Sequence, residues 1–345
     1  MRIARIVMAG ALLASGQMVS AQQIKVDESA WDNSGAMPRP KQIDIALPRA
    51  TGSTKLFELR SGSDKGLDNI ALYSSDDGKV YSTIYVYRAG MPDPSYAMIM
   101  TTTAITKRYK TAVAGAETLV RVAGVPALHR RVFEGAVEPD GTRIAALAGT
   151  MRVGDWIVKL RATGPEARAE EVNAVFAAMV SGLRFGSGVT PAISVIDRVG
   201  ECPATGAAPS AARIATSDVA ALARALPEAV RPRTPAAPRE LCVMGRGKDA
   251  EGVEVVLSEG GLGRPTVMLL GDAGDGIMVV PEQPGVHGWG LATAVAGEAV
   301  MFGPFDRAPG TRQLLAIIED ENSDWAGNAI AVQTVTAEGK VEFEM

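Results

Sequence analysis

Histidine serves most proton-transfer and metal-binding sites near neutral pH, because its ordinary pKa lies close to 6.5. The sequence holds only two histidines, His129 and His287, and neither is accompanied by clustered Cys, Asp or Glu residues. We therefore predict no metal site. His129 lies in a strand-like run and is expected to be packed, whereas His287 lies in the glycine-rich stretch PGVHGWG and is expected to be exposed. A Ser–His–Asp triad needs one histidine and can be assembled from distant segments, so hydrolase chemistry stays open as an alternative.

Two cations, Lys159 and Arg161, lie in the stretch GDWIVKLRATGPE. In a strand, alternate side chains point to opposite faces, so both cations share a face that Trp156 does not. We expect their stems to lie along apolar surface while their charged ends reach water. The alternative is a ligand surface formed by Lys159 and Arg161, to which the exposed His287 would also contribute.

Motifs that predict a cofactor or a nucleophile are missing from the sequence. It contains no G-x-S-x-G, H-E-x-x-H, Walker A or G-x-G-x-x-G pattern. The acidic stretches GDAGDG (271–276) and EDENSDWAGN (319–328) are reminiscent of calcium loops, but Trp325 and Ala331 stand where an EF-hand needs glycine and glutamate. We interpret both stretches as turns and predict no cofactor.

The N-terminus has the three parts of a secretory signal. Arg2 and Arg5 precede a short apolar run, and small residues follow at Val19 and Ala21. The apolar run is about ten residues long, half of the roughly 20 that a membrane-spanning helix needs. Residues 1–21 are therefore predicted to be a signal peptide, and the mature chain to begin at Gln22 as a periplasmic or secreted protein. No later stretch is apolar enough to predict a transmembrane segment.

The two cysteines, Cys202 and Cys242, agree with export to an oxidising compartment. We predict that they form a disulfide, which would close a loop of about 40 residues and stabilise the fold by about 4 kcal/mol in the chain-entropy model. The alternative is a pair of buried free thiols.

Length and charge predict two domains. A chain of 345 residues exceeds the size at which a single core usually keeps growing. A glycine- and proline-containing stretch at 185–191 follows a helical pattern, and the net charge changes from +5 over residues 1–200 to −9 over residues 201–345. We place the domains at 22–188 and 189–345. Without a strongly basic, aromatic-rich face, nucleic acid is not an expected partner.

The first domain is predicted to be α+β. Asp77-Gly78 predicts a hairpin, a helical pattern runs from Met98 to Tyr109, and strands are expected at 116–122 and 126–135. Thr163 and Glu166 have the spacing of a capping box, which predicts a helix beginning near Pro165. Apolar residues recur at helical spacing along the rest of this segment and form a stripe of Val172, Val175, Phe176, Met179 and Leu183.

This order of elements resembles the PsbP-like α/β/α sandwich, which is built on an antiparallel sheet, and is similar to bacterial envelope proteins of the DcrB type. The resemblance covers about residues 40–186 and ends with DWIVKLRATGPEARAEEVNAVFAAMVSGLRF as last strand and closing helix. It consists of element order and carries no site residues. It implies a domain type used mostly in non-catalytic accessory or binding roles.

The second domain is predicted to be mainly β, a sandwich or a barrel-like fold, after one helix in SDVAALARALPEAV (217–230). The function expected from the whole sequence is an exported, non-catalytic binding or accessory protein. Its partner would be an envelope protein or a small ligand. A periplasmic hydrolase, with a site that forms no sequence motif, is the alternative.

Overall fold

The computed structural model describes residues 25–63, 65–194, 196–202, 211–212, 239–246, 254–258, 266–270, 275–280, 288–295, 298–310, 313–314, 329–335 and 341–344. Four of the sequence-based predictions concern features that lie outside these residues: the signal peptide, His287, the helix at 217–230 and the acidic stretch at 319–328. None of the helices among the described residues has the length and apolar character to span a membrane.

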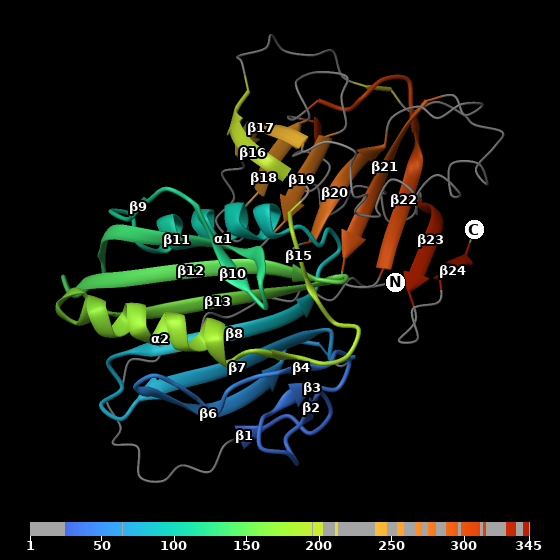
Figure 1. Cartoon of the computed structure of the whole chain (residues 1–345). Coiled ribbons are helices and arrows are strands. Elements are labelled where there is room, and N and C mark those ends of the chain that lie inside the picture. Colours follow the sequence, from blue (N-terminus) through green and yellow to red (C-terminus); the bar gives the residue numbers. More distant parts are fainter. Residues whose placement is uncertain are drawn as a thin grey trace. The chain divides into compact units, whose positions relative to one another are not determined.

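The chain divides into two compact units (Figure 1). Unit 1 comprises Met1–Tyr87 and Ile105–Ile193, and unit 2 comprises Arg88–Ala104 and Ser194–Met345. The predicted boundary lies between residues 188 and 189, whereas in the structure the chain passes from unit 1 to unit 2 for the last time between Ile193 and Ser194. The internal segment Arg88–Ala104 also belongs to unit 2, which the sequence did not predict.

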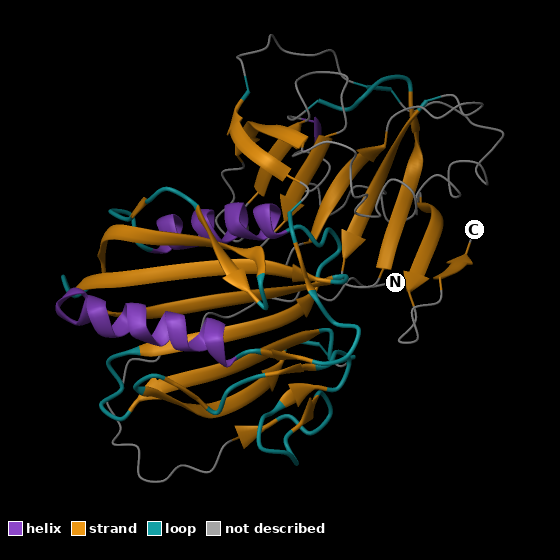
Figure 2. Cartoon of the chain, in the orientation of Figure 1, coloured by secondary structure: helices purple, strands orange, loops and turns teal. Residues whose placement is uncertain are grey.

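Unit 1 is built on a mixed sheet in which most neighbours are antiparallel, with the order β1-β6-β7-β8-β13-β12-β11-β10 (Figure 2). Its strands are β1 Lys25–Val26, β2 Trp31–Asp32, β3 Arg39–Pro40, β4 Ile45–Ala46, β5 Ala50–Thr51, β6 Thr54–Ser61, β7 Asp68–Ser75, β8 Tyr81–Arg88, β9 Val113–Ala114, β10 Thr118–Val122, β11 Val125–Val137, β12 Arg143–Val153, β13 Trp156–Pro165, β14 Arg184–Phe185 and β15 Pro191–Ala192. Its helical elements are the 3-10 turn η1 Glu166–Arg168 and α2 Ala169–Gly182. The remaining helix, α1 Pro94–Arg108, belongs to unit 2 up to Ala104 and to unit 1 from Ile105.

The hairpin predicted at Asp77-Gly78 is present and joins β7 to β8. Gly78 has a φ of +68°, in the left-handed region that glycine adopts without steric cost. β8 lies inside the sheet, between β7 and β13.

Helix α2 covers one face of this sheet. Its buried side chains are those of the predicted apolar stripe, and Val172, Val175, Phe176 and Met179 pack into one core with residues from the sheet. On β12 the alternation of a strand is clear, because Leu147 and Met151 belong to that core while Ala146 and Ala148 pack on the opposite face with Ile105 and Tyr109.

The predicted start of this helix is wrong. Thr163 and Pro165 still pair with β12, so the strand continues through the positions assigned to the cap. Glu166 then begins the 3-10 turn and forms an ion pair with Arg143. The first residue of α2 is Ala169, and its N-cap Arg168 makes no side-chain capping bond. Pairing along the sheet outweighed the local capping pattern.

Unit 2 is mainly β, as predicted. Its described strands form one sheet in sequence order: β16 Ile196–Glu201, β17 Arg239–Arg246, β18 Glu254–Ser258, β19 Thr266–Leu270, β20 Asp275–Val280, β21 Trp289–Val295, β22 Glu298–Phe305, β23 Ala329–Val335 and β24 Val341–Glu344. β16 runs parallel to β17 and the other neighbours are antiparallel. β23 and β24, the last two strands in this order, pair antiparallel.

Within unit 2, the segment Arg88–Ala104 supplies core side chains to the sheet. Met91, Tyr96 and Met100 pack with four side chains from β17 and β19, namely Leu241, Val243, Val267 and Leu269. Asp93 accepts a hydrogen bond from the backbone N–H of Ser95 at the start of α1, and Ser194 donates to the same carboxylate. A segment that lies in sequence between the two parts of unit 1 therefore completes the core of unit 2.

Cys202 and Cys242 form the predicted disulfide, with Cα atoms 4.7 Å apart and a separation of 40 positions in sequence. The bond connects the end of β16 to β17, adjacent strands of the same sheet.

Candidate binding groove

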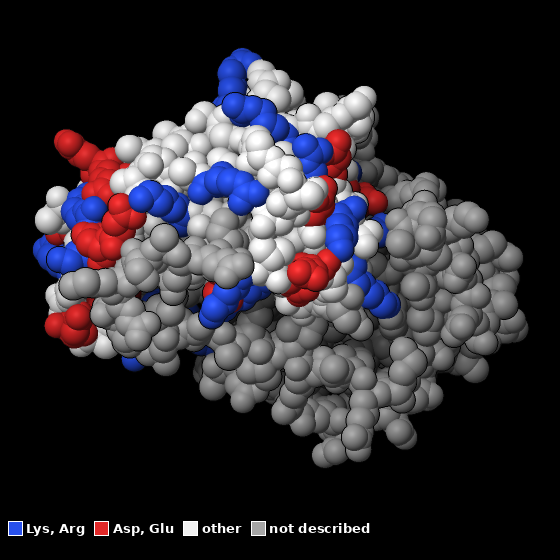
Figure 3. Space-filling model, turned by 90° about the horizontal axis from the view of Figure 1, so that it is seen from below, with Lys and Arg blue, Asp and Glu red and all other residues white. Residues whose placement is uncertain are grey.

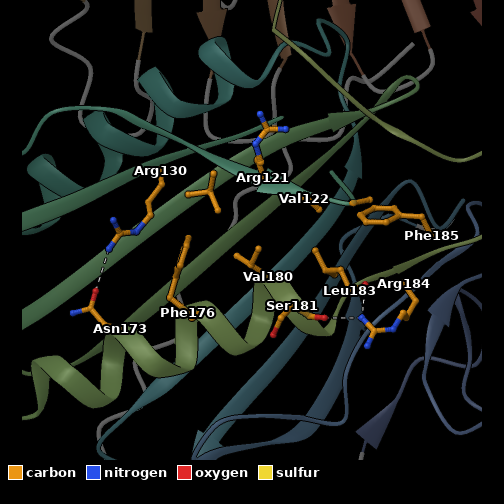
Figure 4. A pocket seen from close by; sticks show the side chains of 13 residues that line it. Arg121, Val122, Arg130, Asn173, Phe176, Val180, Ser181, Leu183, Arg184 and Phe185 are labelled. Carbon is orange, nitrogen blue, oxygen red and sulfur yellow. Dashed lines mark hydrogen bonds between the residues drawn. The ribbon is translucent and has the colours of Figure 1, made fainter. Parts of the chain in front are cut away.

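A groove of about 790 Å³ lies beside α2 on the face of unit 1 that this helix covers (Figure 4). We call it the α2 groove. Its lining residues come from the hairpin of β10 and β11, from the flank of α2 and from β14: Val120, Arg121, Val122, Ala123, Arg130, Asn173, Phe176, Ala177, Val180, Ser181, Leu183, Arg184 and Phe185.

The position of α2 over the sheet explains why the groove exists. The helix packs mainly on β13 and β12, near the middle of the sheet order. β11 and β10 come next and end the sheet, so their apolar side chains on the same face lie beyond the helix flank. Val122 and Leu128 face the same core as α2, while Val120 and Val180 are only partly covered.

The floor and wall of the α2 groove are apolar. Val122, Phe176 and Leu183 are almost completely buried, and Val180 and Phe185 are partly buried. Ala177 is exposed on the helix flank and leaves room above the floor. Small-molecule sites in proteins are typically concave, mostly apolar and about 300–1,000 Å³ in volume, and the α2 groove has these properties.

Arg130 marks the end of the groove near the start of α2. Its Nη2 donates to Asn173 Oδ1 at 3.1 Å, and its guanidinium carbon lies 5.7 Å from the centre of the Phe176 ring. Asn173 in turn donates from Nδ2 to the carbonyl of Ala169, which fixes the orientation of its amide. The guanidinium is thus held over an aromatic ring by a neutral acceptor.

Arg184 marks the other end, where α2 stops. Its Nη1 donates to the carbonyls of Ser181 and Leu183. A cation at this position is favourable because the last carbonyls of a helix lack partners within the helix and carry partial negative charge. Figure 4 shows Arg130 and Arg184 at opposite ends of the row formed by Phe176, Val180 and Leu183.

Arg121 differs from these two arginines. Its Nη1 donates to the carbonyl of Gly124 in the tight turn of its own hairpin, and Figure 4 shows its side chain extending away from α2. Arg121, Arg130 and Arg184 form no ion pair with any residue of the described part of the chain; each donates to a neutral oxygen. The lining of the groove contains no Asp or Glu, so its electrostatic character is cationic.

One face of the described residues carries both signs of charge. In Figure 3, basic side chains cross an otherwise uncharged area, and acidic side chains lie among and beside them. This face is therefore of mixed charge and is not uniformly basic.

The charged end of Lys159 was expected to reach water, but the residue is buried, which corrects that expectation. Lys159 is 3% exposed, and its Nζ lies 4.2 Å from the centre of the Tyr85 ring and 5.5 Å from that of Tyr87. The two tyrosines replace water around the ammonium group by cation–π contact. Arg161 is partly exposed on the same strand, and neither residue lines the α2 groove.

His129 is buried, as expected, and lies in a charged cluster. Its Nδ1 is 2.5 Å from Glu117 Oε1, and Arg131 donates to the other oxygen of that carboxylate. Burial raises the pKa of Glu117, but the hydrogen bonds from His129 and Arg131 outweigh this and hold it below its ordinary value. The side chain that His129 contacts through Nδ1 is therefore a carboxylate, and not the hydroxyl of a serine. Among the described residues, no group of three or more His, Cys, Asp and Glu side chains is placed to bind a metal.

The residues that line the α2 groove were not identified as site residues from the sequence. Phe176 was predicted to be part of the apolar stripe, and no site role was predicted for Arg130. In the sequence, the groove is indicated only by two arginines, Arg130 and Arg184, that lie near an apolar helix and an apolar pair of strands. This pattern predicts a site only if the helix and the strands are known to lie on the same face of the sheet. Compared with models of protein families, the sequence gives no match, and no curated protein matches it.

Proposed function

We propose that this chain is an exported protein with a non-catalytic binding or accessory role, and that its ligand occupies the α2 groove. The observation that carries the proposal is the combination of an apolar floor with two arginines, Arg130 and Arg184, held at its ends by neutral acceptors. Such a groove favours a ligand that is partly apolar and carries negative charge.

Export is supported by the N-terminal signal pattern and by the disulfide between Cys202 and Cys242, since disulfides persist mainly in oxidising compartments. The PsbP-like architecture of residues 40–186 belongs to the same proposal. It is supported by the largely antiparallel sheet with α2 as closing helix, and it implies accessory or binding roles.

Site-specific photo-crosslinking in the native envelope tests the proposed site. A photoreactive amino acid is placed at Ala177, which lines the groove, or at Ala174, which is exposed on the same helix outside the lining. Both positions have the same residue type and the same secondary structure, so they form a matched pair.

The expected result is a defined adduct at position 177 that is absent at position 174 and is lost when Arg130 and Arg184 are both changed to glutamate. Intact mass and peptide mass spectrometry identify the adduct as a small molecule or a polypeptide. Equal adduct formation at both positions, or none at 177, would overturn the α2 groove as the binding site.

A further inference from the structure

The apolar lining of the α2 groove, the arginines at its ends and the lack of hydrogen-bonding groups between them indicate the class of its ligand. We infer that it binds a single-chain acyl anion: an aliphatic chain with a carboxylate or phosphate head, the chain lying along α2 and the head on Arg130 or Arg184. This inference rests on the proposed function and names its ligand.

The apolar part of the ligand is indicated by the groove's walls. Asn173 and Ser181 are eight residues apart on α2, so the helix flank between them is about 12 Å long at 1.5 Å per residue. Along this length the lining consists of Phe176, Ala177 and Val180, facing Val120 and Val122 of the hairpin. An elongated apolar chain buries more of this surface than a compact ligand does.

The absence of hydrogen-bonding groups between the ends favours an acyl chain over a polypeptide. The floor is the face of a sheet, whose backbone groups are directed within the sheet plane toward neighbouring strands. An extended peptide laid on this face would have to leave amide groups without partners, which costs free energy when they are buried. An aliphatic chain has no such groups.

The negative head is indicated by the charge at the two ends. Arg130 and Arg184 each use only part of their five donors in the bonds described above, and a guanidinium matches a carboxylate or phosphate with two parallel hydrogen bonds. The lining holds no carboxylate that would compete for either arginine.

Calorimetric titration of the full mature chain tests this inference. The probes are dodecanoate and dodecyl phosphate, which differ in the head, with dodecyl maltoside as a neutral chain and butanoate as an anion without a long chain. All are kept below the concentrations at which they form micelles. We expect one molecule of each anionic twelve-carbon probe to bind per chain, at least ten-fold more tightly than either control. A preference between the two anions identifies the source of the negative head.

Matched variants locate the site. Ala177→Trp fills the groove and should abolish binding, while Ala174→Trp on the same helix should change affinity less than two-fold. Arg130→Gln and Arg184→Gln are compared with Arg152→Gln, because Arg152 also donates to a neutral oxygen, the carbonyl of Gly154, but does not line the groove. At least one of the first two should weaken dodecanoate binding five-fold or more, and Arg152→Gln should change it less than two-fold. Urea midpoints show whether each variant remains folded.

Several outcomes would overturn the inference: equal binding of the neutral probe, unchanged binding to a folded Ala177→Trp variant, or insensitivity to both arginine changes. If no acyl probe binds while position 177 crosslinks a polypeptide in the envelope, the proposed function stands and the acyl inference fails. If neither acyl binding nor crosslinking occurs at the groove, both fail.

Discussion

Phe176 of α2 lies directly over Gly149 of β12. A Cβ atom at Gly149 would stand 2.7 Å from Phe176 Cζ and 3.1 Å from Leu128 Cδ1, too close on both sides. The absence of a side chain on the central part of the sheet is therefore what lets the aromatic ring reach the floor of the α2 groove.

We predict that Gly149→Ala destabilises the fold by about 1–3 kcal/mol, the usual cost of overpacking a core. Urea unfolding measures the change. Gly200→Ala is the control, because a Cβ at that strand position meets no atom within 4 Å, and it should change stability by less than about 0.5 kcal/mol. An equally small effect at Gly149 would contradict the packing described here.

Lys159 provides the second prediction. Because its ammonium group is buried against Tyr85 and Tyr87, Lys159→Ala should lower the free energy of unfolding by about 2 kcal/mol or more, through lost cation–π contact and lost stem packing. Lys159→Met keeps most of the stem and should cost less. Thermal unfolding compares these variants with Arg161→Ala at the partly exposed neighbour. A loss below about 0.5 kcal/mol in Lys159→Ala would restore the solvated-strand interpretation.

The face of the strand on which Lys159 lies could be predicted from the sequence, but its burial could not. The alternation of residues in GDWIVKLRATGPE correctly predicts which face Lys159 shares with Arg161, since that depends only on the two-residue period of a strand. Whether that face meets water depends on neighbours from other strands. Tyr85 and Tyr87 come from β8, about 70 residues earlier in the chain, and only the sheet order places β8 beside β13.

For the α2 groove too, local patterns predicted the elements but not their arrangement. Its helix and the two strands of its hairpin were predicted from local patterns, namely the apolar stripe through Phe176 and the strand patterns at 116–122 and 126–135. That they form a groove depends on α2 lying over β12 and β13 and not over β10, and no local pattern encodes this offset. The capping pattern at Thr163 and Glu166 was misleading for a related reason, since a long-range strand pairing competes with it.

Glu117 provides a prediction of pH dependence. Its pKa in the folded state is below its ordinary value, with His129 and Arg131 as the groups that face the carboxylate. A carboxyl with a lowered folded-state pKa contributes stability above its unfolded pKa, and this contribution is lost as the pH falls through the folded value. Glu117→Gln should therefore lower stability at pH 7 and have less effect at pH 3.

Urea midpoints of the native chain and of Glu117→Gln at the two pH values test this. The control is Glu28→Gln, at an exposed position of unit 1, which should shift both midpoints little. A Glu117→Gln effect of the same size at pH 7 and pH 3 would show that the carboxylate's charge does not contribute to stability.

The last prediction concerns Met91 and Gly276. Met91 precedes α1, and a side chain on Gly276 of β20 would collide with it, so the two residues pack closely within unit 2. Met91 is almost completely buried, and Met91→Ala should lower the free energy of unfolding by about 2–5 kcal/mol as a large-to-small core change.

The same contacts predict the behaviour of a shortened chain. Because Met91, Tyr96 and Met100 cover Leu241 and Leu269, a chain that begins at Ser194 should expose an apolar sheet face. Such a chain should bind a hydrophobic dye strongly and unfold without a cooperative transition, as monitored by dye fluorescence and circular dichroism. The full mature chain is the reference. Cooperative unfolding of the shortened chain, with little dye binding, would instead show that residues 194–345 form a domain that folds without Arg88–Ala104.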